Sequence, residues 1–248
     1  MKSGIIAAAA GAVLASGSAN AVEIKVLSTQ AAERAYRELV PQFEAASGHK
    51  VSTVFTGTVD VQRRIAAGEM YDLIIMAGPA LDDFIKAGKV VAGSRVDIAK
   101  SGVGAAVPAG APKPDIGTVD ALKKTLIAAK SIGYSTGPSG VYLVGLFERL
   151  GVAEVVKPKL KQTPTGVFVG NIVASGEAEI GFQQVSELAH FPGVDFVGPL
   201  PADIQEVTVF SAGLQVGAKE TEPAKAWLKF LTAPEHAAAF TSRGLTPR

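Results

Sequence analysis

The sequence predicts an α/β protein of two lobes, each a mainly parallel β-sheet flanked by helices, joined by a two-segment hinge. Strand-like and helix-like segments alternate along the chain, which is typical of parallel sheets covered by helices. About 227 of the 248 residues follow an N-terminal targeting segment, which is enough for two hydrophobic cores. Residues 101–117 are rich in Gly and Pro and divide the alternating pattern into two parts.

Residues 1–21 have the composition of a secretory signal peptide. Lys2 precedes an apolar stretch over residues 4–15, and the segment ends in Ala-Asn-Ala. The apolar stretch is shorter than the roughly 20 residues that a membrane-spanning helix needs. We therefore expect cleavage after Ala21 and export of a soluble protein to the periplasm.

The first lobe begins with a βαβαβ pattern. Ala35, Leu39 and Phe43 recur at helical spacing, and Gly48 follows them as a helix stop. A short apolar run after Asp72 indicates a buried strand. Strands are expected at residues 23–28, 50–55 and 71–77, and helices at residues 30–48, 58–68 and 79–90.

The second lobe is expected to begin near residue 101, where the amino-acid composition becomes rich in Gly and Pro. The Gly- and Pro-rich segment is interpreted as a crossing between lobes, and a strand at residues 206–217 as the return. The predicted division is a first lobe of residues 22–102 with 208–248 and a second lobe of residues 103–207. The second lobe should hold helices at 118–129, 140–151 and 170–177, strands at 131–135 and 178–184, and a loop and strand around 161–169. The chain finishes with residues 223–244.

The composition excludes several classes of function. Lys and Arg number 24 against 23 Asp and Glu, with no basic block, so nucleic acid is not an expected partner. There is no Cys, hence no disulfide, thiolate ligand or thiol nucleophile. The three histidines, His49, His190 and His236, stand apart in the sequence, so neither a metal nor another cofactor is expected.

No catalytic motif is visible in the sequence. The stretch "TGPSGV" lacks the second spacer residue of a nucleophile elbow. The adjacent carboxylates Asp82 and Asp83 point apart on a helix, which suits a solvated face better than acid–base chemistry. The sequence therefore predicts a binding protein and not an enzyme, and a hydrolase is not expected.

Hydrogen-bond donors gather at the strand-to-helix turns. Ligands of open α/β sheets bind beyond the carboxyl ends of the strands, and the free N–H groups of helix starts attract anions. Ser and Thr at such positions also serve as ordinary helix caps, so each residue alone is ambiguous. The predicted ligand-binding residues are Thr29, Gln30, Ala31, Gly57, Thr58, Ser139, Gly140, Gly166 and Gln184.

Five stretches in order along the chain, residues 24–51, 55–77, 137–151, 178–190 and 226–245, carry a family resemblance. The chain resembles type II periplasmic solute-binding proteins, and within them the molybdate-binding proteins of ABC importers. The resemblance implies a monomer that closes around a small anion between its lobes and delivers it to an ABC permease in the inner membrane. Thr58 and Ser139 fall where that family places a ligand-contacting hydroxyl and a ligand-contacting amide.

Two departures from the family pattern bear on the ligand. Ala31 stands where the family has a ligand-contacting serine, and Gln184 where it has a ligand-contacting tyrosine. A carboxamide also presents an acceptor oxygen, which favours an organic or otherwise hydrogen-bond-donating ligand, such as a small organic carboxylate, over a bare oxyanion. Arg34 and Arg63 could clamp a carboxylate or be solvated surface residues. A true molybdate or tungstate binder and a periplasmic sensor component remain the alternatives.

Overall fold

The computed structural model describes residues 21–248. The predicted signal peptide therefore lies outside the described residues, apart from Ala21. Within these residues no helix combines the length and the apolar character that crossing a bilayer requires.

The strands of the described residues form one mixed sheet in the order β2-β1-β3-β9-β4-β7-β5-β6, with β8 and β10 paired to β4. Their bounds are β1 (Glu23–Thr29), β2 (Lys50–Thr56), β3 (Leu73–Ala77), β4 (Val96–Pro108), β5 (Ile132–Tyr134), β6 (Leu160–Gln162), β7 (Ile180–Gln184), β8 (Val194–Pro199), β9 (Val207–Leu214) and β10 (Thr246–Pro247).

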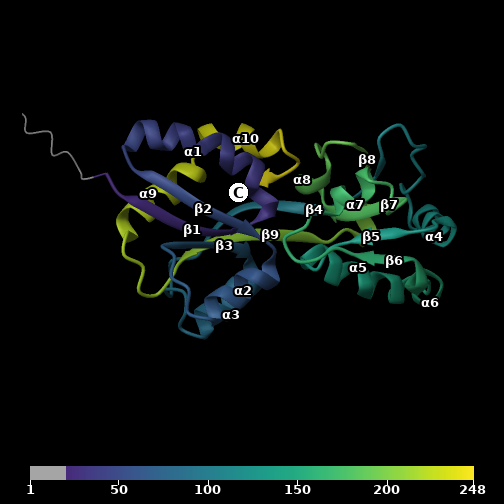
Figure 1. The fold of residues 1–248 in the computed structure, drawn as a ribbon, viewed down its shortest axis with the longest axis horizontal. Helices are drawn as coiled ribbons and strands as arrows, with labels where there is room; N and C mark the ends of the chain where they lie inside the picture. The colour runs from purple at the N-terminus through teal and green to yellow at the C-terminus, as the bar shows by residue number, and fades with distance from the viewer. Residues whose placement is uncertain (1–20) are drawn as a thin grey trace, which may run out of the picture.

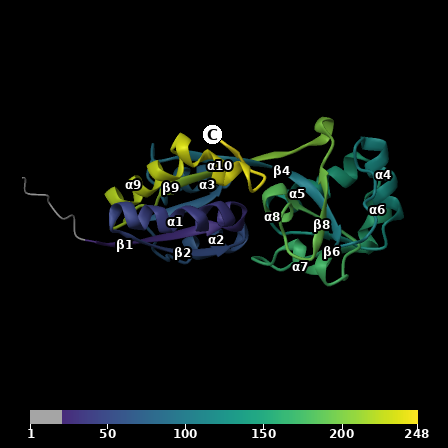
Figure 2. The ribbon, with the colours of Figure 1, turned by 90° about the horizontal axis from the view of Figure 1, so that it is seen from above.

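Helices cover this sheet in two lobes, and the predicted two-lobed α/β fold is confirmed (Figures 1 and 2). The first lobe holds the short 3-10 turn η1 (Gln30–Ala32), α1 (Glu33–Ser47), α2 (Thr58–Ala66), α3 (Gly78–Lys86), α9 (Thr221–Leu231) and α10 (Ala237–Thr241). The second holds α4 (Val119–Ala128), α5 (Pro138–Arg149), α6 (Ala153–Val156), α7 (Val169–Ala174) and α8 (Val185–Leu188). Each lobe has its own buried apolar core, one around Trp227 and the other around Phe147.

The prediction of mainly parallel sheets holds only for part of the strands. β1 pairs in parallel with β2 and β3, and β5 with β6 and β7. β9 is antiparallel to β3 and β4, and β4 is antiparallel to β7 and β8. The chain enters the second lobe along β4 and returns along β9, so these two strands run in opposite directions and pair antiparallel.

Residues 101–117 do cross into the second lobe, but their first half is a strand that the sequence did not predict, because β4 continues to Pro108. Its small residues are required by close packing. A Cβ atom at Gly104 would lie 2.7 Å from the ring of Phe196, and one at Gly102 would lie 2.9 Å from the side chain of Gln205. The lobe boundaries predicted after residues 102 and 207 stay a prediction, and they fall inside β4 and at the start of β9.

Asp72 ties β3 to two other elements of the first lobe. Its carboxylate accepts the backbone N–H of Lys25 in β1 at 2.8 Å. It also accepts the N–H groups of Lys219 and Glu220, just before α9, at 3.0 and 2.9 Å. The side chain is only 5 % exposed. Asp72 therefore has a structural role, and it is remote from the ends of the strands where ligands bind.

We expect Asp72→Ala to lower the free energy of unfolding by about 3 kcal/mol, because buried N–H groups lose their acceptor. Asp83→Ala removes an exposed carboxylate from the neighbouring helix and should change stability by less than about 0.5 kcal/mol. Urea unfolding of both variants measures the difference. Equal stabilities would show that Asp72 does not hold these elements together.

Candidate functional site

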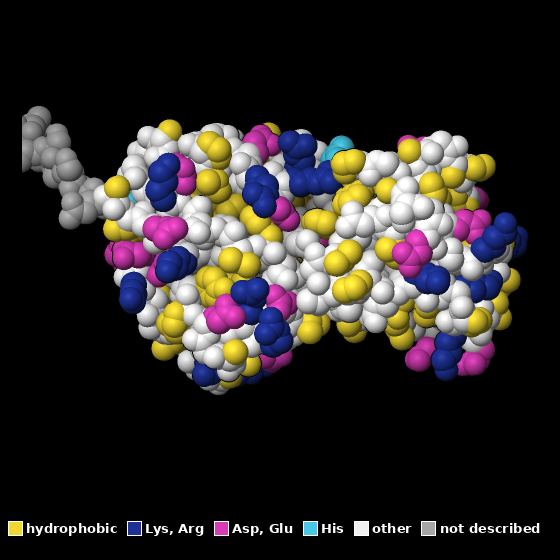
Figure 3. Space-filling view, in the orientation of Figure 1, with side chains coloured by type: hydrophobic (Ala, Val, Ile, Leu, Met, Phe, Trp, Pro, Cys, Tyr) yellow, Lys and Arg dark blue, Asp and Glu magenta, His cyan; other side chains and the backbone are white. Residues whose placement is uncertain are grey.

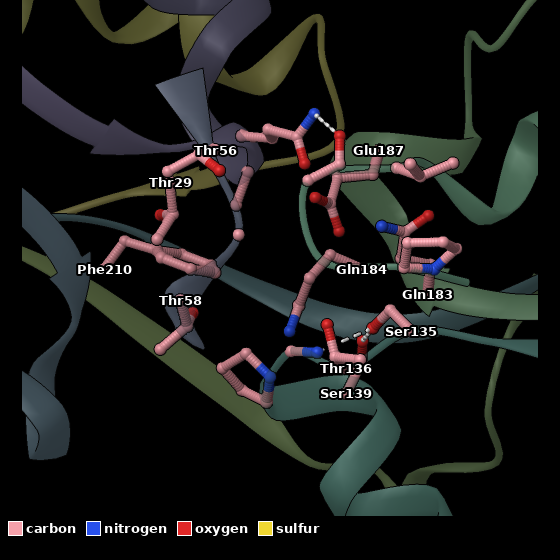
Figure 4. Close-up of a pocket in the computed structure, with 18 residues that line it drawn as sticks. Thr29, Thr56, Thr58, Ser135, Thr136, Ser139, Gln183, Gln184, Glu187 and Phe210 are labelled. Atoms are coloured by element: carbon pink, nitrogen blue, oxygen red, sulfur yellow. Dashed lines mark hydrogen bonds between the residues drawn. The ribbon is translucent and has the colours of Figure 1, made fainter. Parts of the chain in front are cut away.

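A cavity lies between the two lobes, beyond the carboxyl ends of β1 and β2 on one side and β5 and β7 on the other. It encloses about 40 Å³, or about 390 Å³ when the mouth that is open to solvent is included. Figure 4 shows polar side chains from both lobes around a common space. The lining residues are Thr29, Gln30, Ala31, Thr56, Gly57, Thr58, Ser135, Thr136, Gly137, Pro138, Ser139, Pro164, Gly166, Val167, Gln183, Gln184, Glu187 and Phe210.

The first lobe contributes the start of α2 and the end of β1. Thr58 is the first residue of α2, and the cap position before it is Gly57, so Thr58 is not the capping residue. The first N–H groups of a helix have no partner within the helix and remain available to an anion. The hydroxyl of Thr29 is buried and has no hydrogen-bond partner among the described residues. These groups can bind a ligand without breaking an existing bond.

The second lobe contributes the start of α5. Gly137 is the cap and Pro138 the first residue, so Ser139 supplies the first N–H group of this helix that can face the cavity. The hydroxyl of Ser139 lies 3.3 Å from that of Ser135. The N–H of Gly137 donates to the Ser135 hydroxyl at 3.2 Å, which holds the turn in shape.

Gly140 is the one predicted ligand-binding residue that does not line the cavity. Its N–H already donates to the Gly137 carbonyl at 3.0 Å. A Cβ atom at this position would lie 1.7 Å from the carbonyl oxygen of Ser135. The structure therefore uses Gly140 for close packing of β5 against α5, a role that sequence spacing does not distinguish from ligand contact.

The lobes touch each other on the α1 side of the cavity. Gln30 donates its side-chain N–H to the Gly166 carbonyl at 3.0 Å. A Cβ atom at Gly57 would lie 2.8 Å from the nitrogen of Gly166, whose φ of 77° is in the left-handed region that favours glycine. These three predicted residues come together across the lobes and close this side of the cleft.

Arg34 and Arg63, for which a carboxylate clamp was one of two possibilities, do not reach the cavity. Arg63 pairs with Asp60 on its own helix at 2.5 Å and is exposed. Arg34 donates to the carbonyl of His190 and lies 5.8 Å from the ring centroid of Phe191. Neither arginine lines the cavity. Arg34 instead adds a second contact between the lobes.

Gln184 lines the cavity, but its amide is occupied within the protein. In the orientation that satisfies both ends of the amide, the oxygen accepts from the Thr208 hydroxyl at 3.0 Å. The nitrogen then donates to the carbonyls of Ser101 and Gly102 at 3.0 and 3.2 Å. The side chain is 2 % exposed. It fixes the junction of β7, β4 and β9 and has no free donor for a ligand.

Several lining residues were missed by sequence reasoning, and Glu187 matters most among them. It lies in the short helix α8, directly after β7, and is 9 % exposed. Burial raises the pKa of its carboxyl to about 8, against hydrogen bonds from the backbone of Gln184 and the side chain of Gln183. The one signal in the sequence was an acidic residue three positions after the end of a predicted strand. Thr56, Ser135, Thr136, Pro138 and Phe210 were also missed.

Thr58 and Pro138 line both the cavity and a wider groove outside it. The cavity therefore continues into this groove. Arg95 and Arg149 line the outer groove. Arg95 is paired with Asp82 and Asp97, at 2.5 and 3.1 Å. Figure 3 shows the outline narrowing between the lobes, with acidic and basic side chains interspersed on both. The groove gives the cavity a route to solvent.

The donor set suits an anion and not a metal. Within residues 21–248 no three His, Asp or Glu side chains come close enough together to hold a metal ion. Among the described lining residues none is Lys, Arg or His. Main-chain N–H groups and hydroxyls can hold an anion by charge-assisted hydrogen bonds.

Comparisons with known proteins agree on one family. The family described as "Bacterial extracellular solute-binding protein" matches residues 24–246. A Pseudomonas protein named aconitate isomerase is 38 % identical over 230 residues, covering 90 % of this chain and 87 % of that protein. The molybdate-binding protein ModA of Azotobacter vinelandii is 30 % identical over 237 residues, covering 92 and 91 % of the two chains. A solved structure of the periplasmic molybdate-binding protein of the same organism superposes with a TM-score of 0.76 at 19 % identity, over 90 and 98 % of the chains.

We expect Gly140→Ala to lower the free energy of unfolding by at least about 2 kcal/mol, because the added methyl overlaps a backbone oxygen. Gly145→Ala is the matched control within the same helix. There the methyl meets only the side chain of Arg149, at 3.4 Å, and should raise stability by about 0.5 to 1 kcal/mol. Denaturant unfolding of the two variants should show changes of opposite sign. A neutral Gly140→Ala would contradict the packing role.

Proposed function

The chain belongs to the bacterial extracellular solute-binding proteins, and from this premise we propose that it binds a small organic polycarboxylate in the cleft between its lobes. It acts in the periplasm and hands this ligand to the permease of an ABC importer. The match over nearly the whole mature chain supports the binding role. The relative named aconitate isomerase supports the ligand class, since aconitate is an unsaturated tricarboxylate.

The observation that carries this proposal is the lining of the cavity by neutral donors from both lobes. Thr29 and Thr58 belong to one lobe and Ser139 to the other. A ligand shifts the balance between open and closed forms only through contacts that differ between the two forms. An anion bridging these donors makes such contacts in the closed form alone.

The departures from the molybdate-binding pattern support a carboxylate over a tetrahedral oxyanion. Ala31 has no hydroxyl, and the amide of Gln184 is held by Thr208 and backbone carbonyls. Two donors that the resemblance leads us to expect are therefore missing. Glu187 adds a carboxyl that is mainly protonated at neutral pH and can donate to a ligand oxygen.

We expect cis-aconitate, trans-aconitate or citrate to raise the melting temperature of the protein, and molybdate and sulfate to leave it unchanged. A ligand at about 100 times its Kd adds roughly 2.7 kcal/mol of stability. Thr58→Ala should weaken binding of the best ligand about tenfold, since one charge-assisted hydrogen bond is lost. Thr221→Ala, at the first position of α9, removes a hydroxyl outside the cleft and should leave affinity unchanged.

Calorimetric titration of ligand-stripped protein gives the affinities. Molybdate binding at or below about 1 μM, with no response to any carboxylate, would contradict the proposed ligand class. The chain would then be a molybdate-binding protein in function as well as in fold.

A second candidate function is isomerisation of an unsaturated polycarboxylate. The family supports the expectation of a binding protein that is not an enzyme, but the relative at 38 % identity carries the name aconitate isomerase. A binding cleft becomes a catalytic one when it also supplies a group that exchanges a proton with the ligand. Glu187 is an ionisable group of this kind inside the cavity.

We expect the purified protein to convert cis-aconitate into trans-aconitate with multiple turnovers. Proton NMR separates the vinyl signals of the two isomers and follows the reaction directly. A Thr58→Ala variant should slow the conversion in proportion to its loss of binding, which excludes a contaminating enzyme as the source. Unchanged cis-aconitate after an incubation with stoichiometric protein would reject this second function and leave the binding function in place.

A further inference from the structure

We propose that Glu187 is the catalytic acid–base residue of this cleft, moving one proton between two carbon atoms of an unsaturated polycarboxylate. The proposal rests on the isomerase function put forward above. It assigns a chemical role to a side chain that neither the family nor the relatives' names identify. Among the described residues that line the cavity, Glu187 is the only one with an acidic or basic side chain.

Glu187 follows Gln183 and Gln184 closely in the chain, and all three line the cavity. Gln183 accepts the N–H of Val169 through its side-chain oxygen at 2.8 Å, so its amide nitrogen is free to donate. Both that amide and the backbone of Gln184 oppose the rise in the pKa of Glu187 that burial causes. Figure 4 shows the side chain of Glu187 directed into the space that the lining residues of both lobes enclose.

The charged groups around Glu187 do not neutralise it. Glu33, at the start of α1, lies near enough for its negative charge to oppose ionisation of Glu187. Arg34 follows Glu33 in α1, and its guanidinium donates a hydrogen bond to the carbonyl of His190. Asp195 in β8 accepts the N–H of Gly110. In β4, Asp97 accepts from the Ser211 hydroxyl and Lys100 is exposed, while β7 and α7 contain no charged residue.

A buried acid without a cationic partner costs stability unless it is protonated, so its presence in a ligand cavity points to a use for the proton. Burial raises the pKa of Glu187 to about 8. Its ionised form is therefore a stronger base than an ordinary carboxylate, and roughly one molecule in ten carries it at pH 7. A pKa near the working pH is the best compromise for a group that both takes and returns a proton.

The reaction balances without any further reactant. The ionised carboxylate of Glu187 removes a proton from the saturated CH₂ group beside the double bond, so one C–H bond breaks and one O–H bond forms. The released electron pair becomes the new double bond, and the original π electrons move onto the far carbon and its carboxylate. Glu187 then returns the proton to that far carbon. The double bond has moved by one position, and cis and trans arrangements are exchanged.

The remaining cavity residues suit the intermediate of this reaction. Negative charge spreads over a carboxylate of the ligand as the first proton leaves. The N–H groups at the starts of α2 and α5, with the hydroxyls of Thr29 and Thr58, can stabilise that charge in a site closed to most water. Proton transfer by Glu187 and charge stabilisation by these donors are separate contributions, so they can be tested separately.

The test compares wild-type protein with Glu187→Gln, Glu187→Asp and Glu177→Gln, the last an exposed acid of the same lobe. Each protein is titrated with cis-aconitate by calorimetry and assayed by proton NMR for trans-aconitate. We expect Glu187→Gln to bind cis-aconitate within about threefold of wild type and to isomerise it at least about 100-fold more slowly. Glu187→Asp should retain part of the activity, and Glu177→Gln should match wild type.

The pH dependence of kcat/KM is a second measurement, and a purely structural role of Glu187 would not affect it. In wild type kcat/KM should rise about tenfold per pH unit below the pKa of Glu187 and level off near pH 8, because only the ionised form accepts a proton. Glu187→Gln should lose this dependence.

The outcomes separate this proposal from the binding function. Activity of Glu187→Gln above about a tenth of wild type overturns the catalytic role. Wild-type protein that binds cis-aconitate without isomerising it overturns it too, while the binding function stands. Protein that binds no carboxylate at all rejects both.

Discussion

The antiparallel pairing of β4 with β9 is the constraint on which the cleft depends. β4 is 13 residues long and pairs with β9 in the first lobe and with β7 in the second, so one sheet runs through both. Helices α2 and α5 start on opposite sides of this junction and face one another across it. The register of two strands therefore sets the distance between the hydrogen-bond donors that line the two sides of the cavity.

The described residues that line the cavity include no basic side chain, so the proposed anion would be bound by neutral donors beside a single acid, Glu187. Neutral donors carry no net charge to attract an anion, so they would bind it through directed hydrogen bonds from both lobes. A carboxylate among them would repel the ligand, whereas a protonated carboxyl donates to it. Because burial raises the pKa of Glu187, the acid and the anion can occupy the same space.

The sequence predicted the architecture better than the chemistry. Hydrophobic periodicity predicted the strands and helices of the first lobe. The rule that ligands bind at strand-to-helix turns selected Thr29, Thr58 and Ser139, which line the cavity. β4 was missed because Gly102 and Gly104, which permit close packing, resemble linker residues in a sequence. The internal bonding of Gln184 was not foreseen and Glu187 was missed, because the direction of a side chain at the end of β7 depends on partners far along the chain, such as Thr208. No local pattern records those contacts.

Binding and turnover differ in this cleft by what happens to one proton. Donors that hold the bound anion and the reaction intermediate equally well add affinity but do not accelerate the reaction. Acceleration requires an interaction that changes as the C–H bond breaks. Glu187 changes from carboxylate to carboxylic acid at that step, in surroundings that favour the neutral form. The burial that disfavours its charge before the reaction therefore lowers the barrier to taking the proton, so a fold built for capture needs only one such residue to become an enzyme.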